Sequence, residues 1–191
     1  HELAAFLPAA AILAIADEAV RARTLALIAI PRFRLYGSAD LIGAQLGGAA
    51  KNVIAIAAGV VEGLGLGENA RAALITRGVA ELARLVAAEG GRPETAAGLS
   101  GLGDLILTCT GAASRNHSLG VALGRGGALA EVLAARPGVT EGVHTAPALV
   151  ARAARTGSEM PIAEAVAALL DGRASAGMLV DLLLSRRTKE E

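Results

Sequence analysis

The apolar positions of residues 1–37 follow a different pattern from the rest of the chain. A short apolar run over 11–15 predicts a strand, and residues 18–28 predict a helix that Pro31 ends. The alternation of apolar and basic residues over 33–36 predicts a second strand. This β-α-β order is typical of the end of an α/β domain. Two strands do not form a stable sheet alone, so either they pair with something outside this chain or the chain is a fragment.

From Ser38 onward the pattern predicts only helices. Ser38 or Asp40 is suited to cap a long helix that runs to about Glu62, and the glycine-rich stretch 63–67 breaks it. Glycines inside a helix cost about 1 kcal/mol each relative to alanine. Several of them together indicate close backbone contact with a neighbour or a ligand, and this helix contains Gly43, Gly47, Gly48 and Gly59.

A second long helix is predicted over residues 68–89, where apolar residues recur at helical spacing until a glycine pair stops it. Pro93 is expected at the first position of the next helix. Shorter helices are predicted over about 104–110, 117–124, 128–135, 145–156, 161–171 and 174–184. The expected fold class is therefore mainly α, with a residual α/β piece at 1–37 and an all-helical domain at 38–191.

Composition narrows the class of function. The 191 residues carry 18 Lys+Arg against 18 Asp+Glu, so the formal net charge is zero and no broad basic surface is expected. Only three residues are aromatic, which leaves no stacking platform for bases, and we expect no nucleic-acid partner. Alanine and glycine supply 45 and 24 residues, a composition that suits helices in close contact.

The single cysteine, Cys109, cannot form an internal disulfide, which indicates a reducing compartment and predicts a cytoplasmic location. No apolar run reaches the roughly 18–20 residues of a membrane span, although the mean hydropathy is +0.52. The first residues lack a basic segment, so no signal peptide is expected.

Lysine usage points to one position. Arginine occurs 16 times and lysine only twice, at Lys189 in a polar tail and at Lys51 inside a small-residue, apolar helix. Arginine stays charged, whereas a partly buried lysine can exchange a proton, which is chemistry that general acid/base catalysis uses. A lysine that extends from a core helix to solvent explains the position equally well. The two interpretations remain open on this feature alone.

Asp104 follows a glycine-containing turn at the start of a predicted helix. The simpler interpretation is a helix N-cap, and spacing alone favours it. The functional interpretation is a carboxylate that pairs with Lys51. Thr108 follows one helical turn later and projects from the same face as Asp104.

Ser114, Arg115 and Asn116 lie between two helical segments. A helix start attracts anions, and the planar guanidinium of Arg115 matches a phosphate with two hydrogen bonds. An ordinary cap with a surface arginine is the alternative. We expect His117 at the surface and Cys109 as an inert core thiol. No His/Cys/Asp cluster has metal-ligand spacing, so no metal is predicted.

Several ordered blocks of the chain resemble bacterial NAD(P)-dependent glycerol-3-phosphate dehydrogenase. The similarity runs from about residue 31 to 184. The matching motifs are Gly47-Gly48-Ala49-Ala50-Lys51-Asn52-Val53, residues 65–78, Gly98-Leu99-Ser100-Gly101-Leu102-Gly103-Asp104-Leu105, Thr108-Cys109-Thr110, Ser114-Arg115-Asn116 and Glu141-Gly142-Val143.

The resemblance implies an N-terminal Rossmann domain, of which 1–37 would be the end, followed by a helical substrate domain. It implies the reversible reduction of dihydroxyacetone phosphate to sn-glycerol 3-phosphate with NAD or NADP, feeding phospholipid synthesis. The implied partner is thus a small phosphorylated substrate, and the apolar helices suggest a homodimer.

By the same resemblance, each candidate residue has a role. Lys51 and Asp104 are implied as catalytic. The substrate would be bound by Lys51, Asn52, Asp104, Thr108, Ser114, Arg115 and Asn116. The cofactor would be contacted by Arg115, Val139 and Glu141.

One departure from the family is large, because the glycine-rich phosphate loop that follows a first strand is absent from this sequence. We therefore expect negligible dehydrogenase activity and weak cofactor affinity from this polypeptide alone. Two alternatives stay open at this point. One is a non-catalytic helical dimerisation module, and the other is a related two-domain dehydrogenase for another small hydroxy acid.

Overall fold

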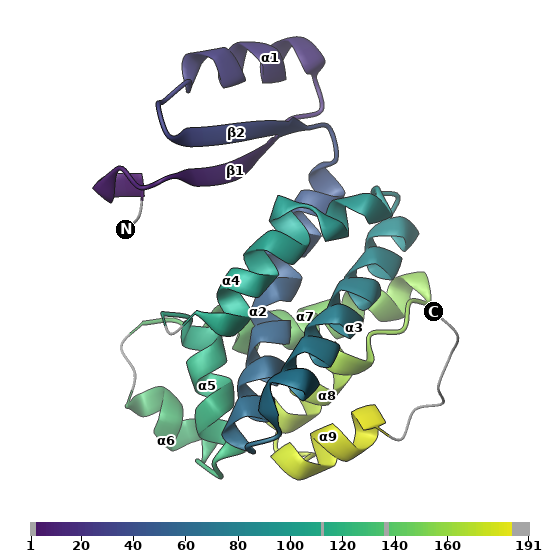
Figure 1. Cartoon of the computed structure of the whole chain (residues 1–191). Helices are drawn as coiled ribbons and strands as arrows, with labels where there is room; N and C mark the ends of the chain where they lie inside the picture. The colour runs from purple at the N-terminus through teal and green to yellow at the C-terminus, as the bar shows by residue number, and fades with distance from the viewer. Residues whose placement is uncertain (1–2, 112, 136–137, 185–191) are drawn as a thin grey trace.

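The computed structural model describes residues 3–111, 113–135 and 138–184, which form a helical body with a small β-α-β unit at one end (Figure 1). The mainly α fold preceded by a β-α-β piece agrees with the sequence prediction. The polar tail that contains Lys189 lies outside the described residues.

The two strands are short and parallel. β1 (Ala9–Ala14) pairs along its length with β2 (Phe33–Ser38), and Ala9 lies opposite Phe33. A 3-10 helix, η1 (Leu3–Ala5), precedes β1 and was not predicted from the apolar pattern. A single helix cannot cover both faces of a two-stranded sheet. Much of the β-α-β unit therefore remains exposed to solvent.

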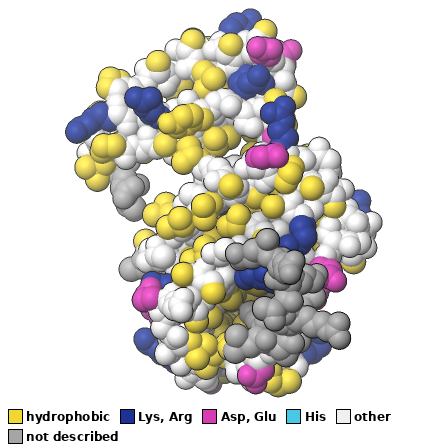
Figure 2. Space-filling model, turned by 45° about the vertical axis from the view of Figure 1, so that its right-hand side comes forward, with side chains coloured by type: hydrophobic (Ala, Val, Ile, Leu, Met, Phe, Trp, Pro, Cys, Tyr) yellow, Lys and Arg dark blue, Asp and Glu magenta, His cyan; other side chains and the backbone are white. Residues whose placement is uncertain are grey.

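Helix α1 (Glu18–Leu27) connects the strands. The Asp17 carboxylate caps it and accepts a hydrogen bond from the backbone N–H of Val20 at 2.8 Å. Hydrophobic side chains gather on the outside of the β-α-β unit (Figure 2). Its exposed large apolar residues are Leu3, Phe6, Leu7, Val20, Leu27, Ile28, Ile30 and Tyr36.

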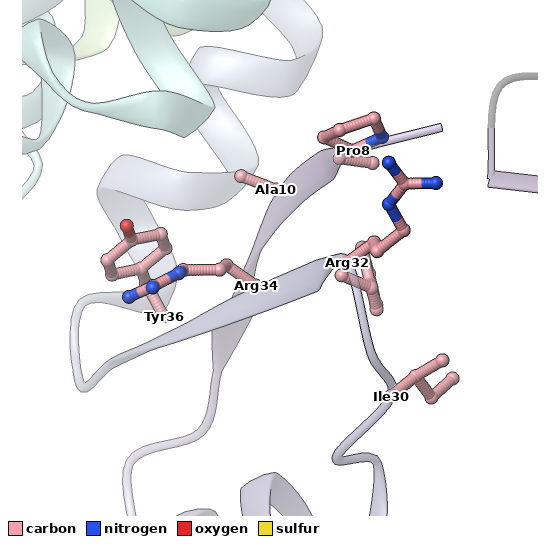
Figure 3. A pocket seen from close by; sticks show the side chains of 8 residues that line it. Pro8, Ala10, Ile30, Arg32, Arg34 and Tyr36 are labelled. Atoms are coloured by element: carbon pink, nitrogen blue, oxygen red, sulfur yellow. The ribbon is translucent and has the colours of Figure 1, made fainter. Parts of the chain in front are cut away.

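An open cavity of about 590 Å³ lies on this unit (Figure 3). Its lining includes Pro8, Ala10, Ile30, Arg32, Arg34 and Tyr36. None of the candidate site residues borders it, so this cavity does not mark the expected chemistry. The site must be sought around the central helix instead.

Helix α2 (Leu41–Gly63) is the centre of the helical body. Asp40 is its N-cap and accepts a hydrogen bond from the backbone N–H of Gly43 at 2.9 Å. α2 is long and apolar enough to cross a membrane by length and composition, whereas the sequence pattern suggested no such run. Within the described residues it is the core helix, because 72% of its apolar window is buried among other helices.

The other helices are, in chain order, α3 (Gly67–Ala88), the 3-10 helix η2 (Pro93–Ala97), the π-helical turn η3 (Leu99–Gly103), α4 (Asp104–Thr110), α5 (Arg115–Gly124), α6 (Leu129–Ala134), α7 (Glu141–Thr156), α8 (Pro161–Leu170) and α9 (Ala176–Leu184). Most of them pack around α2, whereas α6 packs on α5, and α9 packs on α8 and α5 (Figure 1).

Most predicted boundaries agree with these elements to within two residues. The main difference is α7, which begins at Glu141 rather than at about 145 and continues through Pro147. Thr140 occupies its N-cap position without a side-chain cap hydrogen bond, so the helix begins four residues earlier than the apolar spacing predicted. A second difference is η3, a π-helical turn where the glycine spacing predicted only a turn.

Glycines let the backbones of α2 and α5 approach each other closely. A Cβ atom added at Gly120 would lie 2.0 Å from the carbonyl oxygen of Ile56, and one added at Gly59 would lie 2.1 Å from that of His117. Real Cβ atoms do not approach backbone this closely, so α5 sits at a depth that only glycine permits. Gly43, Gly47 and Gly59 of α2 therefore serve packing, one of the two interpretations of the sequence pattern, whereas nothing lies within 4 Å of a Cβ at Gly48.

Gly47 allows η3 to approach the backbone of α2 in the same way. A Cβ at Gly47 would lie 2.2 Å from the carbonyl oxygen of Ser100. The π-helical turn can therefore lie directly on α2, four residues before Lys51. Since α4 begins at Asp104, immediately after this turn, the close contact places the start of α4 beside Lys51.

Asp40 fixes the other end of this arrangement. Besides capping α2, its carboxylate accepts hydrogen bonds from the backbone N–H of Arg92 at 2.9 Å and from the hydroxyl of Thr95 at 2.6 Å. Burial opposes the charged form, but the bonds from Gly43, Thr95 and Arg92 outweigh it and lower the pKa of Asp40. One carboxylate thus ties the start of α2 to η2.

Replacing Gly120 by alanine tests the glycine contact. We expect Gly120→Ala to lower the free energy of unfolding by about 1–3 kcal/mol, because the new methyl group must push α5 away from α2. Gly48→Ala is the matched control, since nothing lies within 4 Å of a Cβ at Gly48. It should leave stability unchanged or raise it by up to about 1 kcal/mol. Urea unfolding followed by circular dichroism measures both, and equal losses would contradict the packing argument.

Candidate functional site

Lys51 and Asp104 form an ion pair between α2 and α4. The Lys51 Nζ atom contacts Oδ2 of Asp104 directly, and the side chains are 25% and 33% exposed. The amine is therefore neither sealed in the core nor free in solvent, and it has a fixed acidic partner. The structure brings together the two residues that the sequence offered as a catalytic pair.

The capping interpretation of Asp104 is wrong. Gly103, with helical backbone angles, occupies the N-cap position of α4 and makes no side-chain cap hydrogen bond. Asp104 is the first residue of the helix, where a carboxylate also interacts favourably with the helix dipole. Its side chain points to Lys51, so the pairing interpretation describes the observed geometry.

Thr108 lies one turn further along α4. Its hydroxyl donates to the carbonyl oxygen of Asp104 at 2.6 Å and lies 3.5 Å from Oδ1 of the same residue. Lys51, Asp104 and Thr108 are therefore one cluster on facing surfaces of α2 and α4. A proton-carrying amine, a carboxylate and a hydroxyl can together hold and donate to a substrate oxygen.

Asn52, next to Lys51, takes part in a second group of hydrogen bonds. Its Nδ2 donates to Oε2 of Glu141 at 2.8 Å, and its Oδ1 accepts from Nδ2 of Asn116 at 2.9 Å. Oδ1 of Asn116 accepts from the backbone N–H of Gly142 at 2.9 Å. We call this group of four residues the amide ring, because it begins and ends on the first turn of α7.

The start of α5 lies beside the amide ring. Ser114 caps α5 by accepting a hydrogen bond from the backbone N–H of His117 at 3.2 Å. Arg115 is exposed at the first helical position, and a Cβ added at Gly138 would lie 2.7 Å from its Nη1 atom. The guanidinium therefore lies against the segment that leads into α7, where Val139 is exposed.

The structure thus gathers the predicted site residues around α2. Lys51 and Asn52 lie on α2, Asp104 and Thr108 on α4, Ser114 to Asn116 at the start of α5, and Val139 and Glu141 at the start of α7. Their roles remain predictions.

The expectation for His117 is wrong, because this residue is buried. Its Nε2 atom lies 3.2 Å from Oε2 of Glu62, without the alignment of a hydrogen bond. Glu62 also receives a hydrogen bond from Nη1 of Arg71 at 2.7 Å. His117 precedes the buried Gly120 by three residues, so helical periodicity along α5 was the signal that could have placed it inside.

Sequence reasoning also missed the parts that glycine plays at the site. Gly142 supplies the backbone N–H that begins the amide ring, and Gly138 leaves room beside Arg115. Gly138 has a φ of +88°, a conformation that favours glycine. Among the described residues, no group of three or more His, Cys, Asp or Glu side chains is placed to hold a metal ion.

Comparison with known proteins agrees with the fold and with the order of these elements. The family described as NAD-dependent glycerol-3-phosphate dehydrogenase C-terminus matches residues 40–181. The chain belongs to this dehydrogenase family, as its sequence motifs indicated.

Individual relatives extend the match to the β-α-β unit. Glycerol-3-phosphate dehydrogenase [NAD(P)+] of Caulobacter vibrioides is 56% identical over 190 residues, which is 100% of this chain and 57% of that protein. The enzyme of Parvibaculum lavamentivorans is 57% identical, with the same coverage of each. The chain therefore spans a little more than half the length of the curated relatives it matches.

Solved structures show the same arrangement. The crystal structure of glycerol-3-phosphate dehydrogenase from Coxiella burnetii matches 97% of this chain and 57% of its own, with a TM-score of 0.92 and 43% identity. The Saccharomyces cerevisiae enzyme GPD1 matches 95% of this chain and 56% of its own, with a TM-score of 0.83 and 27% identity.

Cys109 provides a test of the packing at the site. It is buried on the inner side of α4, and burial raises the pKa of its thiol to about 12, against a smaller opposing effect of the Arg71 charge. We expect no reaction with a thiol reagent at pH 8 in the folded protein and one reacted thiol per chain in urea, because the thiolate is the reactive form. Fast labelling without denaturant would contradict this packing of α4.

Proposed function

We propose that the protein to which this chain belongs catalyses the reversible NAD(P)H-dependent reduction of dihydroxyacetone phosphate to sn-glycerol 3-phosphate. The observation that carries the proposal is the Lys51–Asp104 ion pair, beside an arginine at a helix start, within a chain of the glycerol-3-phosphate dehydrogenase family. In this assignment Lys51 and Asp104 are catalytic.

Lys51 performs the proton step. As a ketone is reduced, negative charge develops on its oxygen, and the ammonium group of Lys51 stabilises that charge and donates a proton to the oxygen. In the reverse direction the neutral amine takes the proton from the hydroxyl. Asp104 holds the amine in place through the ion pair, and the Thr108 hydroxyl lies 3.5 Å from Oδ1 of the same carboxylate.

Arg115 anchors the phosphate. Its exposed guanidinium lies at the first position of a ten-residue helix, where backbone N–H groups also favour an anion. Ser114 flanks it and contributes a hydroxyl group, and Asn116, whose amide is engaged by Asn52 and Gly142, holds this helix start in place. Fixing the phosphate at this end holds the reacting carbon near Lys51, and positioning of this kind is a large part of catalysis.

Arg115, Val139 and Glu141 would hold the cofactor, NAD or NADP. The bare Cα of Gly138 next to the Arg115 guanidinium fits this role, because a Cβ there would lie 2.7 Å from Nη1 of Arg115 and crowd the guanidinium. When bound, the nicotinamide supplies the hydride. The open sheet of the β-α-β unit suits a place at the edge of a larger cofactor-binding domain, with a boundary at residues 37 and 38.

The remaining parts of the proposal rest, in order, on the single cysteine, the apolar helices and the family resemblance. They are a cytoplasmic location, a homodimer, and delivery of the product to phospholipid synthesis. Lys51 with its carboxylate partner favours an enzyme over a non-catalytic dimerisation module. Arg115 at a helix start favours a phosphorylated substrate over another small hydroxy acid.

Lys51→Arg tests the catalytic assignment. The variant should be made in a full-length enzyme that joins this chain to the N-terminal part of the Caulobacter vibrioides relative. We expect kcat to fall by about 10²–10⁴-fold, because arginine keeps the charge but cannot exchange the proton. Asp104→Asn should also lower kcat, whereas the matched control Asp171→Asn, at an exposed surface pair, should not. Full activity of Lys51→Arg in a folded protein would exclude Lys51 as the acid/base.

The 191-residue chain by itself should show negligible turnover of dihydroxyacetone phosphate with NADH or NADPH. The reason is that its sequence contains no glycine-rich phosphate loop to bind the dinucleotide. A steady-state assay that follows the absorbance of the reduced nicotinamide compares it with the full-length enzyme. Comparable rates would show that the chain binds the cofactor without that loop.

A further inference from the structure

The hydrogen bonds of the amide ring can run in only one donor-to-acceptor direction, and the groups at its two ends determine that direction. The backbone N–H of Gly142 can only donate, so the oxygen of Asn116 must face it, at 2.9 Å. The nitrogen of Asn116 then faces Asn52, which leaves the nitrogen of Asn52 for the Glu141 carboxylate, an acceptor when ionised. A backbone donor at one end and a carboxylate acceptor at the other thereby fix the orientation of the two amides.

Both amides are enclosed. Asn52 is 5% exposed and Asn116 is 7% exposed. The oxygen of Asn52 is engaged by Asn116, and its nitrogen is engaged by Glu141 and lies 3.4 Å from the carbonyl oxygen of Gly48. Asn52 therefore holds its neighbours and does not present its amide to a substrate, in contrast to the role that the resemblance implies.

Each of the two amides in the ring directly follows a proposed site residue. Lys51 precedes Asn52 on α2, and Arg115 precedes Asn116 on α5. Successive side chains on a helix are separated by about 100°, from 3.6 residues per turn. A buried amide that is held by hydrogen bonds fixes the rotation of its helix about the helix axis. The direction in which the neighbouring cationic side chain projects is then fixed as well.

The start of α7 is pressed onto the same ring. A Cβ added at Gly142 would lie 2.6 Å from Cδ1 of Ile56, 2.7 Å from Oδ1 of Asn116 and 2.8 Å from the carbonyl oxygen of Asn52. The first turn of α7 is therefore held in contact with α2 and α5, and this contact sets the position of the Glu141 carboxylate.

We propose that the amide ring is a positioning device, in which the backbone N–H of Gly142 and the acceptor oxygen of Glu141 together orient Asn52 and Asn116 and so align Lys51 with Arg115. Asn52 is a positioning residue in this scheme, and Glu141 has a role toward the substrate groups in addition to its place beside the cofactor. The inference rests on the proposed function, since alignment matters only if Lys51 and Arg115 act on one substrate.

Exchanging the acid and the amide tests the direction of the ring. Asn52→Asp places two carboxylates face to face, and we expect kcat/KM of the full-length enzyme to fall about 100-fold, the loss that a displacement of about 1 Å can cause. In the double variant Asn52→Asp/Glu141→Gln, the new carboxylate accepts from both amides. It should recover at least about 10-fold of that loss, a coupling that double-mutant cycles detect.

Matched controls are available elsewhere on the surface. Asn69→Asp and Glu131→Gln make the same changes at exposed positions and should leave kcat and KM unchanged. Circular dichroism and the melting temperature check that each variant is folded. If Asn52→Asp does not fold, Glu141→Ala replaces it, since Glu141 is exposed. At saturating NADPH this variant should lower kcat about 10-fold while Glu141→Gln, which keeps an acceptor oxygen, retains most of it.

The outcomes separate this inference from the proposed function. Wild-type activity in Asn52→Asp, no recovery in the double variant, or unchanged kcat in Glu141→Ala would each overturn the positioning role while the dehydrogenase activity stands. Absence of turnover in the unmutated full-length enzyme would instead overturn the proposed function.

Discussion

The burial of α2 is the constraint on which the site depends. A helix enclosed along most of its length must find a partner for every polar side chain it carries, because an unpaired polar group away from water is costly. Lys51 and Asn52 are the two such residues in its middle, and each is matched from a different helix. Asp104 comes from α4, and Asn116 and Glu141 come from α5 and α7. The contacts that form the proposed catalytic cluster thus also satisfy the polar side chains of a buried helix.

The depth of this packing is set by glycine. Where α2 meets α5 and η3, backbone touches backbone at Gly59, Gly120 and Gly47, and a single methyl group at any of them would collide with a carbonyl oxygen. Interiors of this density move in discrete steps and do not yield gradually. Helices in such contact have little freedom to slide or rotate, so the side chains that leave them keep fixed directions. A composition rich in alanine and glycine therefore contributes to the precision of the site.

Local signals predicted the elements, and long-range contacts decided the site. Proline and glycine marked the ends of α2, α3 and the later helices, so their boundaries could be read from the sequence. Asp104 was harder, because a cap is a local preference whereas its actual partner is 53 residues away. The amide ring joins residues separated by 64 and 89 positions, and nothing in the spacing of one chain indicates such a closure. His117 was misplaced for the opposite reason, since its polarity was given more weight than the periodicity of α5.

Asp40 links the end of the β-α-β unit to this site, although it lies away from Lys51. It lies two residues after β2, caps α2, and accepts hydrogen bonds from the backbone N–H of Arg92, just before η2, and from the hydroxyl of Thr95 within η2. η2 leads into η3, and η3 leads into Asp104. Since hydrogen bonding lowers the pKa of Asp40, its stabilising effect is present above the pKa of the unfolded carboxyl and is lost as the pH falls through the lower folded value. At neutral pH the Asp40 carboxylate stays charged and keeps its hydrogen bonds to α2 and η2. The β-α-β unit and the Asp104 carboxylate that faces Lys51 are therefore connected through one buried acid.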